Sequence, residues 1–250
     1  MREEIVQDHT GPECRDKELG LIGVPAAEQL MIAAGELRFR NGIPDLLLFM
    51  AHPRTVALGL RDRLADQPKD LLVSRRRLET EGIALTRSVR GGGITYHWPG
   101  QVVCYPVLAL RRHEQDVPAY MGKLEEVGIV TLKRFGVHAV RRRDSAAHVG
   151  LWIDNTKVVS MGVRISRWVT SFGFAINVAG DLGPSQYLRP CGLEGVRLTT
   201  LEEILGNAPP RSMVIDAVRE SFASIFGRIP EEMPDALLDQ ILPPPRTVPN

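Results

Sequence analysis

Three consecutive glycines, Gly91 to Gly93, lie between two apolar segments that predict β-strands, IALTRSV and QVVCYPVLAL. Glycine is disfavoured inside strands because it adds no side chain to the packing and loses the most backbone entropy on folding. A Thr-Tyr-His sequence and a Pro-Gly pair follow the glycines closely. The segment therefore predicts a loop whose backbone either turns tightly or comes very close to another group.

Amphipathic helical patterns and short apolar runs alternate along the rest of the chain. Helices are predicted over residues 24–42, 74–82, 117–136, 198–206 and 212–227, and strands over residues 45–53, 83–89, 101–110, 148–154, 157–166 and 168–178. Asn155-Thr156 predicts a hairpin turn, and Thr200 is a suitable helix cap. Strands with helices between and after them indicate the α/β (α+β) class, with a mixed β-sheet flanked by helices.

The length and the ends of the chain predict a single domain. A chain of 250 residues can form one large α/β domain with a substantial core. Residues 1–18 are charged and without pattern and predict a loose tail, residues 19–228 predict the domain, and residues 229–250 predict a proline-rich tail. The first ten residues resemble neither a secretory signal nor an organellar presequence, and no apolar run is long enough for a membrane span. A cytoplasmic protein is expected.

Composition excludes several function classes. The net charge of +1 gives no global indication of nucleic-acid or membrane binding. Three widely separated cysteines argue against a disulfide framework and a zinc site, and the six histidines lack metal-ligand spacing. The glycine run matches neither the P-loop nor the dinucleotide-binding pattern, so no metal and no cofactor is predicted.

Two arginine runs, Arg75 to Arg77 and Arg141 to Arg143, are the densest charge clusters in the chain. Such runs usually form solvated surface, and that interpretation is favoured here. The functional alternative is a docking patch for an acidic partner protein.

Cys191 differs from the other two cysteines in its context. It lies in a Pro-Cys-Gly turn, whereas Cys104 alternates within a strand pattern and Cys14 lies in the predicted tail. A lone loop cysteine is more often inert than catalytic, unless a nearby cation favours its thiolate. Lys157, which opens an apolar strand, is a candidate cation, although spacing alone favours an ordinary solvated lysine. A cysteine–lysine pair would suit acyl transfer, because a thiolate attacks thioesters readily and an amine can carry the proton.

His97 lies four residues after the last glycine of the run and is a third candidate. A single histidine beside a tyrosine is more often a hydrogen-bonded structural residue than a base, but the glycine loop around His97 makes the two interpretations equally favoured. The sequence leaves both interpretations open.

Three segments, taken together and in order, resemble the octanoyltransferases of lipoate biosynthesis, also called the lipoate–protein ligase B family. RGGGITYHWPGQVVCYPVLAL is similar to the family's Arg-Gly-Gly-x-x-Thr-Tyr-His-Gly-Pro-Gly-Gln signature. KVVSMGVRISRWVTSFGFAINV is similar to its Lys-x-x-Ser-x-Gly-x-Arg strand and the following strand, and RPCGLEGVRLTTL to the segment with its catalytic cysteine. The resemblance extends from about residue 20 to residue 205 and implies the fold of biotin and lipoate protein ligases.

The resemblance also implies roles for individual residues. Cys191 matches the nucleophile that forms an acyl-thioester, and Lys157 matches the lysine that lowers its pKa and moves protons. The implied substrate-binding residues, which line the acyl chain and the reacting carbonyl, are Arg90, Gly91, Gly92, Gly93, Ile94, Thr95, Tyr96, His97, Ser160, Met161, Gly162, Gly173, Phe174 and Ala175. The glycines would let the backbone approach an octanoyl chain and aim amide groups at a developing oxyanion.

The implied reaction moves an octanoyl group from octanoyl-acyl carrier protein to Cys191 and then to a lysine amine. The implied acceptors are the lipoyl domains of 2-oxoacid dehydrogenase E2 subunits or of the glycine cleavage H protein. An acidic carrier protein would give the arginine runs a use.

Four positions depart from the family pattern. Trp98 stands where the family has glycine, and Phe172 where it has histidine. Ala51 replaces a glutamate, and Ala57 a threonine. Because Trp98 and Phe172 are bulky and apolar, they are expected to narrow or reshape the acyl pocket.

Two other functions compete with the acyltransferase. The first is an ATP-dependent lipoate or biotin ligase of the same fold, which would need ATP and no cysteine. Cys191 and the Pro-Gly-Gln sequence after Trp98 favour the transferase over the ligase. The second is a non-catalytic module that binds acyl groups or lipoyl domains, since a fold does not determine function. The presence of both Cys191 and Lys157 counts against it.

Overall fold

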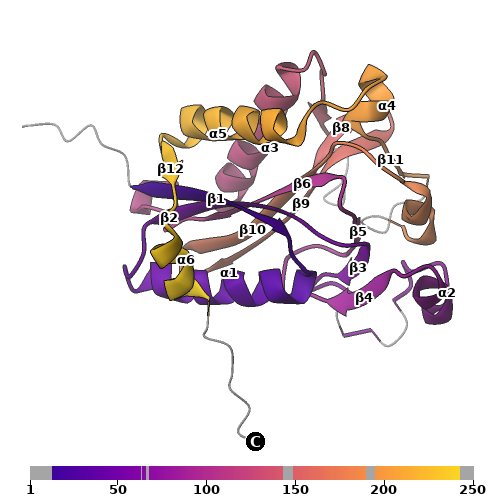
Figure 1. Cartoon of the computed structure of the whole chain (residues 1–250), viewed down its shortest axis with the longest axis horizontal. Helices are drawn as coiled ribbons and strands as arrows, with labels where there is room; N and C mark the ends of the chain where they lie inside the picture. The colour runs from indigo at the N-terminus through magenta and orange to yellow at the C-terminus, as the bar shows by residue number, and fades with distance from the viewer. Residues whose placement is uncertain (1–12, 63, 66–67, 143–148, 190–194, 243–250) are drawn as a thin grey trace, which may run out of the picture.

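The computed structural model describes residues 13–62, 64–65, 68–142, 149–189 and 195–242. Over this part of the chain, a large β-sheet lies between two helical layers (Figure 1). Helices α3 (Val117–Lys133) and α5 (Arg211–Phe226) cover one face, and α1 (Val24–Phe39) and α6 (Asp235–Ile241) cover the other. The predicted α/β class, a mixed sheet flanked by helices, is confirmed.

The main sheet contains nine strands of the described residues. In the order in which they lie side by side, eight of them are β12 (Pro230–Glu232), β1 (Cys14–Leu21), β2 (Asp45–Ala51), β6 (Gln101–Val107), β10 (Val169–Asn177), β9 (Thr156–Ser166), β8 (Leu151–Ile153) and β7 (Val140–Arg141). The ninth, β11 (Arg197–Leu198), pairs with β9 in parallel. Strand β1 is parallel to β2 and β12, whereas the pairs from β2 to β7 are antiparallel, so the sheet is mixed.

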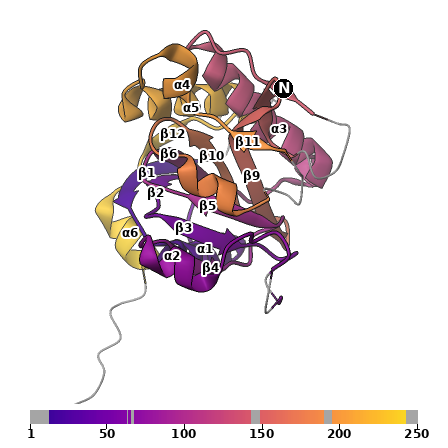
Figure 2. The same cartoon turned by 90° about the vertical axis from the view of Figure 1, so that its right-hand side faces the viewer.

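A smaller sheet stands at one end of the main sheet, where Figure 2 views it. Its strands are β4 (Ala84–Arg87), β3 (Thr55–Leu58) and β5 (Ile94–His97), in that spatial order. The sequence predicts a continuous loop from the glycines to the next strand, but Ile94–His97 forms a strand of its own. It does so because the glycine loop returns the chain to β3, with which β5 pairs antiparallel.

Strand β2 is apolar at almost every position because both of its faces pack against other parts of the protein. Leu46, Leu48 and Met50 pack in the cluster beneath α1, whereas Leu47 and Phe49 pack in the cluster beneath α3 and α5. Both faces of the strand are therefore buried, which removes the usual alternation of apolar and polar residues. Strand β2 therefore lies in the core between the two helical layers.

The predicted helices are confirmed. Ser74 caps α2 (Arg75–Thr80), and its hydroxyl accepts a hydrogen bond from the Arg77 amide at 3.2 Å. Thr200 caps α4 (Leu201–Leu205) in a reciprocal capping box with Glu203. Short 3₁₀ turns are η1 (Arg112–Glu114) and η3 (Gly183–Tyr187). Among the helices of the described residues, none combines the length and the apolarity that a bilayer crossing requires.

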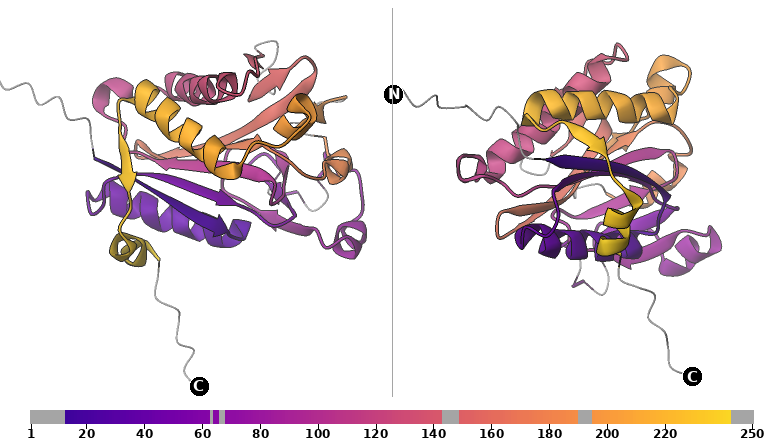
Figure 3. Two further views of the ribbon diagram at one scale, coloured as in Figure 1. Left: turned by 45° about the horizontal axis from the view of Figure 1, so that its top comes forward. Right: turned by 60° about the vertical axis from the view of Figure 1, so that its left-hand side comes forward.

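The two predicted tails are wrong where the structure describes them. Strand β1 starts at Cys14, which is 1% exposed, and the later segment 229–250 contributes both β12 and α6 (Figure 3). Strand β1 is not recognisable from the sequence because its charged residues form ion pairs with distant parts of the chain. Asp16 accepts a hydrogen bond from Arg219 of α5 at 2.7 Å, and Arg15 pairs with Glu231 of β12. Residues 1–12 and 243–250 lie outside the described part of the chain.

Candidate active site

A cavity of about 220 Å³ lies where the glycine loop meets β9 and β10 of the main sheet. Of the described residues that the resemblance implies, all but Tyr96 line it. Its lining residues are Arg61, Arg90, Gly91, Gly92, Gly93, Ile94, Thr95, His97, Tyr105, Met121, Val149, Lys157, Ser160, Met161, Gly162, Val163, Gly173, Phe174 and Ala175. Segments far apart in the sequence therefore form one site.

The glycine loop is held against β9 by direct backbone contact. The Gly91 amide donates to the Val163 carbonyl at 2.9 Å, and a Cβ on Gly91 would lie only 2.6 Å from that oxygen. Gly92 adopts a φ of +83°, a backbone conformation that residues with a Cβ atom rarely adopt. The close approach predicted from the glycines is thus made in part to the protein's own backbone.

Arg90 holds the same loop from inside. Its guanidinium donates to the Ala57 carbonyl at 2.9 Å and to the Gly91 carbonyl at 3.0 Å, and the residue is only 8% exposed. The Arg90 carbonyl accepts from the Leu60 amide, so the loop is also tied to the chain after β3. Arg90 therefore shapes the wall of the cavity as well as lining it.

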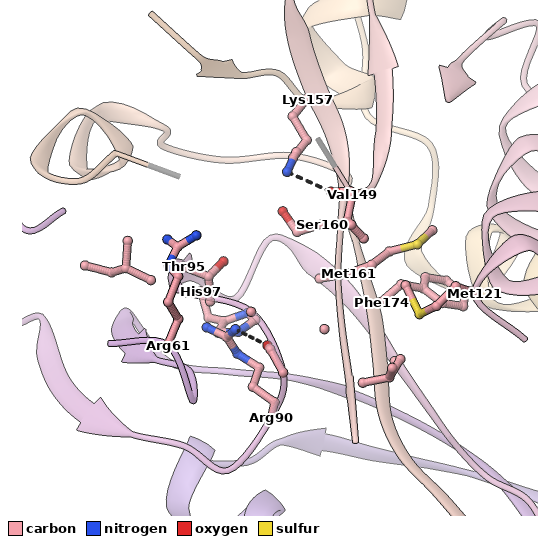
Figure 4. A pocket seen from close by; sticks show the side chains of 18 of the residues that line it. Arg61, Arg90, Thr95, His97, Met121, Val149, Lys157, Ser160, Met161 and Phe174 are labelled. Carbon is pink, nitrogen blue, oxygen red and sulfur yellow. Dashed lines mark hydrogen bonds between the residues drawn. The ribbon is translucent and has the colours of Figure 1, made fainter. Parts of the chain in front are cut away.

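The two strand segments implied by the resemblance lie directly opposite each other. Ser160, Met161 and Gly162 of β9 pair with Ala175, Phe174 and Gly173 of β10 in antiparallel register. Both sets line the cavity. Figure 4 shows the side chains of Met161, Phe174 and Met121 of α3 gathered on one side, away from the polar residues. The cavity therefore has an apolar side that suits a hydrocarbon chain.

Lys157 is buried, so the interpretation as a solvated lysine is wrong. It is 2% exposed, its Nζ donates to the Val149 carbonyl at 2.9 Å, and the same Nζ lies 4.7 Å from the centre of the Trp152 ring (Figure 4). Burial removes water from the amine, and the Val149 carbonyl and the Trp152 ring face hold the nitrogen in place. A lysine held in this way can exchange protons with a group in the cavity.

Strand β5 divides its side chains between the cavity and the core. Thr95 and His97 line the cavity, whereas Tyr96 stacks on Trp98 with ring centres 5.4 Å apart. The structure therefore does not place Tyr96 among the cavity-lining residues. Burial, with a smaller effect from His52 and Arg90, holds the pKa of His97 well below its usual value, so the ring is neutral near pH 7.

Cys191 lies outside the described residues. The chain is described again from residue 195, and β11 pairs Leu198 with Lys157 of β9. The remaining cysteines, Cys14 and Cys104, are buried thiols, and burial raises the pKa of both. Neither lines the cavity, so neither replaces Cys191 as the candidate nucleophile.

Trp98 and Phe172 do not narrow the cavity, contrary to expectation, because neither lines it. Trp98 donates from its indole nitrogen to the Ala179 carbonyl at 2.7 Å and packs in the core of the small sheet. Phe172 has a φ of +58°, which turns its ring away from the cavity into the cluster beneath α1, where it meets Tyr105 at 5.5 Å.

Five residues that line the cavity were not predicted from the sequence: Arg61, Tyr105, Met121, Val149 and Val163. Met121 lies in a predicted amphipathic helix, where an apolar residue is expected to pack in the core. Tyr105 and Val163 lie in predicted strands, but which strand neighbours which is not visible in a single sequence. No signal in the sequence distinguished Arg61 or Val149.

The arginine runs are partly neutralised within the chain. Arg77 pairs with Glu81 at 2.6 Å, and Arg141 pairs with Glu125 at 3.1 Å. Arg143 lies outside the described residues. The described contacts favour the interpretation as ordinary surface for these two arginines.

Comparison with known proteins places this chain in a family. The family described as "lipoyl protein ligase A/B catalytic domain" matches this chain over residues 28–223. Octanoyltransferase of Solibacter usitatus is 38% identical over 86% of this chain and 92% of the relative. Octanoyltransferase of Desulforamulus reducens is 34% identical over 82% of this chain and 88% of the relative, and that of Flavobacterium johnsoniae is 41% identical over 72% and 79%.

Solved structures with the same fold are more distant in sequence. A bipartite lipoate protein ligase from Thermoplasma acidophilum has a TM-score of 0.69 at 18% identity, covering 92% of this chain and 91% of that one. Biotin protein ligase from Aquifex aeolicus has a TM-score of 0.54 at 14% identity, covering 85% and 70%. These similarities confirm the predicted biotin and lipoate protein ligase fold.

Proposed function

The chain belongs to the octanoyltransferases, within the lipoyl protein ligase A/B catalytic-domain family, and from this we propose that it carries an octanoyl group from acyl carrier protein to the lysine amine of a lipoyl domain. Membership of this family makes the protein an enzyme of the transferase class. The donor, the acceptor and the residue roles below are part of the proposal.

The observation that carries the proposal is the buried Lys157 at a cavity with an apolar side. An acyl chain needs an apolar wall, and the reaction at its carbonyl needs a group that exchanges protons without water. Lys157, Met161 and Phe174 supply these two requirements in one cavity. Elsewhere in the described part of the chain, the ion-paired residues and the core residues do not combine a buried proton-exchanging group with an apolar cavity wall.

The first half of the reaction forms the acyl-enzyme. The Lys157 amine takes the proton of the Cys191 thiol, and the thiolate attacks the thioester carbonyl of the octanoyl carrier. The bond from the carbonyl to the carrier's sulfur breaks, and that sulfur receives the proton from the Lys157 ammonium. Cys191 then holds the octanoyl group as a thioester, and Lys157 is an amine again.

The second half transfers the group to the acceptor. The amine of the acceptor lysine attacks the thioester carbonyl, the bond to the Cys191 sulfur breaks, and an amide forms. Lys157 takes a proton from the attacking nitrogen and returns it to the cysteine sulfur, so the enzyme is regenerated. In this proposal, amides of the glycine loop donate to the oxyanion that develops on the carbonyl oxygen.

The ATP-dependent ligase remains the second candidate function. It is supported only by the fold, since the ligase structures are 14–18% identical to this chain, whereas relatives at 34–41% identity carry the name octanoyltransferase. A ligase would need ATP and free octanoate or lipoate and would be indifferent to Cys191. The non-catalytic module would show no turnover with either donor.

The test is transfer of octanoate to a purified lipoyl domain, followed by intact mass spectrometry. The proposal expects an octanoyl mass increase on the lipoyl domain with octanoyl-acyl carrier protein and without ATP. The control reaction supplies octanoate and ATP in place of the carrier. Product only in the control would establish the ligase, and product in neither would support the non-catalytic module.

A further inference from the structure

A buried chain of side-chain hydrogen bonds connects the cavity to the strand that bears the lysine. His97 Nδ1 lies 2.8 Å from Gln101 Oε1, and Gln101 Nε2 donates to Asn177 Oδ1 at 3.0 Å. Asn177 Nδ2 donates to the backbone carbonyls of Lys157 at 3.2 Å and Thr199 at 3.0 Å. All five residues are less than 9% exposed, so water does not replace these bonds.

The two backbone carbonyls determine the direction of every hydrogen bond in this chain. A carbonyl can only accept, so the Asn177 group that faces Lys157 and Thr199 must be the NH₂ group. Asn177 Oδ1 therefore faces Gln101 and requires a donor, which is the Gln101 NH₂ group. Gln101 Oε1 then faces His97 and can only accept, so His97 Nδ1 must carry a hydrogen.

The neighbours of His97 do not oppose this assignment. The nearest titratable and charged groups are His52, whose ring centre lies 5.0 Å away, and Arg90. His52 Nδ1 lies 2.7 Å from the Ile22 carbonyl and must donate to it, so His52 Nε2 accepts from the Tyr105 hydroxyl at 3.2 Å. Burial and these neighbours lower the pKa of His97, which keeps the ring neutral and its Nε2 unprotonated.

We propose that Gln101 and Asn177 are positioning residues for acyl transfer, because they hold His97 in the tautomer whose Nε2 presents a lone pair in the cavity. This inference rests on the proposed function. A neutral imidazole nitrogen accepts a hydrogen bond from the attacking amine of the acceptor and so orients that amine toward the acyl carbonyl. Asn177 has a second effect, since its bonds fix the distance between Lys157 on β9 and Thr199 before α4.

The tautomer of His97 can be measured without any substrate. In protein labelled with ¹⁵N-histidine, long-range ¹H–¹⁵N correlation spectra distinguish a protonated ring nitrogen from an unprotonated one. The wild type is expected to show Nδ1 protonated and Nε2 unprotonated for His97. Gln101→Leu removes the oxygen that accepts from Nδ1, so His97 in this variant is expected to lose its preference for the Nδ1-protonated tautomer. In the same variant, transfer from the acyl-enzyme to the lipoyl domain is expected to slow by about 10²-fold.

Gln101→Glu provides the rescue that a purely structural role would not give. A carboxylate still accepts from Nδ1, although it no longer donates to Asn177 Oδ1, so the tautomer should be retained, but its negative charge raises the pKa of His97. Transfer should therefore recover at higher pH, and the pH profile should shift upward relative to the wild type. Thr131→Val is the matched control, because it removes buried hydrogen bonds to Ser221 and Ala217 between α3 and α5, away from the cavity.

Two results would overturn the inference. The first is a wild-type His97 protonated at Nε2, and the second is a Gln101→Leu variant that keeps both the tautomer and the transfer rate. Either result with intact transfer would leave the proposed function in place. The expected tautomer in a wild type that transfers nothing would instead refute the proposed function, and with it the role of the imidazole.

Discussion

Replacing Gly91 by alanine tests whether the glycine loop is held by backbone contact with β9. The new Cβ would lie 2.6 Å from the Val163 carbonyl oxygen, whereas ordinary contacts begin at 3.4 Å. The two backbones must therefore separate by about 0.8 Å, which would stretch the Gly91–Val163 hydrogen bond from 2.9 Å to beyond its usual range.

The magnitude follows from these two effects. The lost hydrogen bond contributes about 0.5–1.5 kcal/mol, and forcing the packed backbones apart costs about 1–3 kcal/mol. Gly91→Ala should therefore lower the free energy of unfolding by roughly 1.5–4.5 kcal/mol, which corresponds to a fall in Tm of about 3–18 °C for a chain of this size. Because the loop also lines the cavity, octanoyl transfer should slow by about 10²-fold.

The assay combines urea unfolding, followed by circular dichroism, with the octanoyl-transfer reaction. Gly35→Ala is the control, because a Cβ at that position in α1 meets nothing within 4 Å and should stabilise the helix by about 0.5–1 kcal/mol. Wild-type stability and wild-type transfer in Gly91→Ala would refute the claim that this glycine is required by β9.

Three further predictions concern the proton carrier, the pocket wall and the pH dependence of stability. Lys157→Met keeps the length of the side chain but removes the amine, and should slow acyl-enzyme formation by about 10²–10⁴-fold in rapid-quench assays. Phe172→His should lower the free energy of unfolding by about 1–3 kcal/mol, yet leave the preferred acyl length unchanged in assays with carriers of different chain lengths, because Phe172 does not line the cavity. Burial alone would raise the pKa of Glu114, but hydrogen bonds from Arg228 and Arg111 outweigh burial and lower this pKa. Ionised Glu114 should therefore stabilise the fold above about pH 4.3, and this stabilisation should be lost as the pH falls. Glu114→Gln should lower the free energy of unfolding by about 3 kcal/mol at pH 6 and reduce its dependence on acid in urea titrations.

Each of these predictions has an outcome that contradicts it. Acyl-enzyme formation at the wild-type rate in Lys157→Met would exclude the lysine as the proton carrier. A shift toward another acyl length in Phe172→His would mean that this side chain reaches the acyl chain after all. An unchanged acid dependence in Glu114→Gln would show that another carboxylate controls unfolding at low pH.

The local elements were predictable because their signals lie within a few residues. Ser74 and Thr200 mark helix starts by side-chain caps that need only their own turn. The apolar run of β2 indicated a buried strand for the same reason. Strand β1 was missed because its charges are neutralised by Arg219 and Glu231, which lie more than 200 residues further along the chain.

The site was predictable as a set of residues but not as a geometry. The resemblance brought together the glycine loop, β9 and β10, and the structure confirms that these segments line one cavity. It could not show that Phe172 turns away, because that depends on a positive φ at one residue. Nor could it show that Lys157 is buried, since burial depends on Trp152 and on the neighbouring strands.

The most direct test of the central claim is intact mass spectrometry of the protein after mixing with octanoyl-acyl carrier protein, without ATP. We expect a gain of one octanoyl group that hydroxylamine removes and that does not form in Cys191→Ser. No adduct with octanoyl carrier or with carriers of other chain lengths, or an equal adduct in Cys191→Ser, would contradict transfer through a Cys191 thioester.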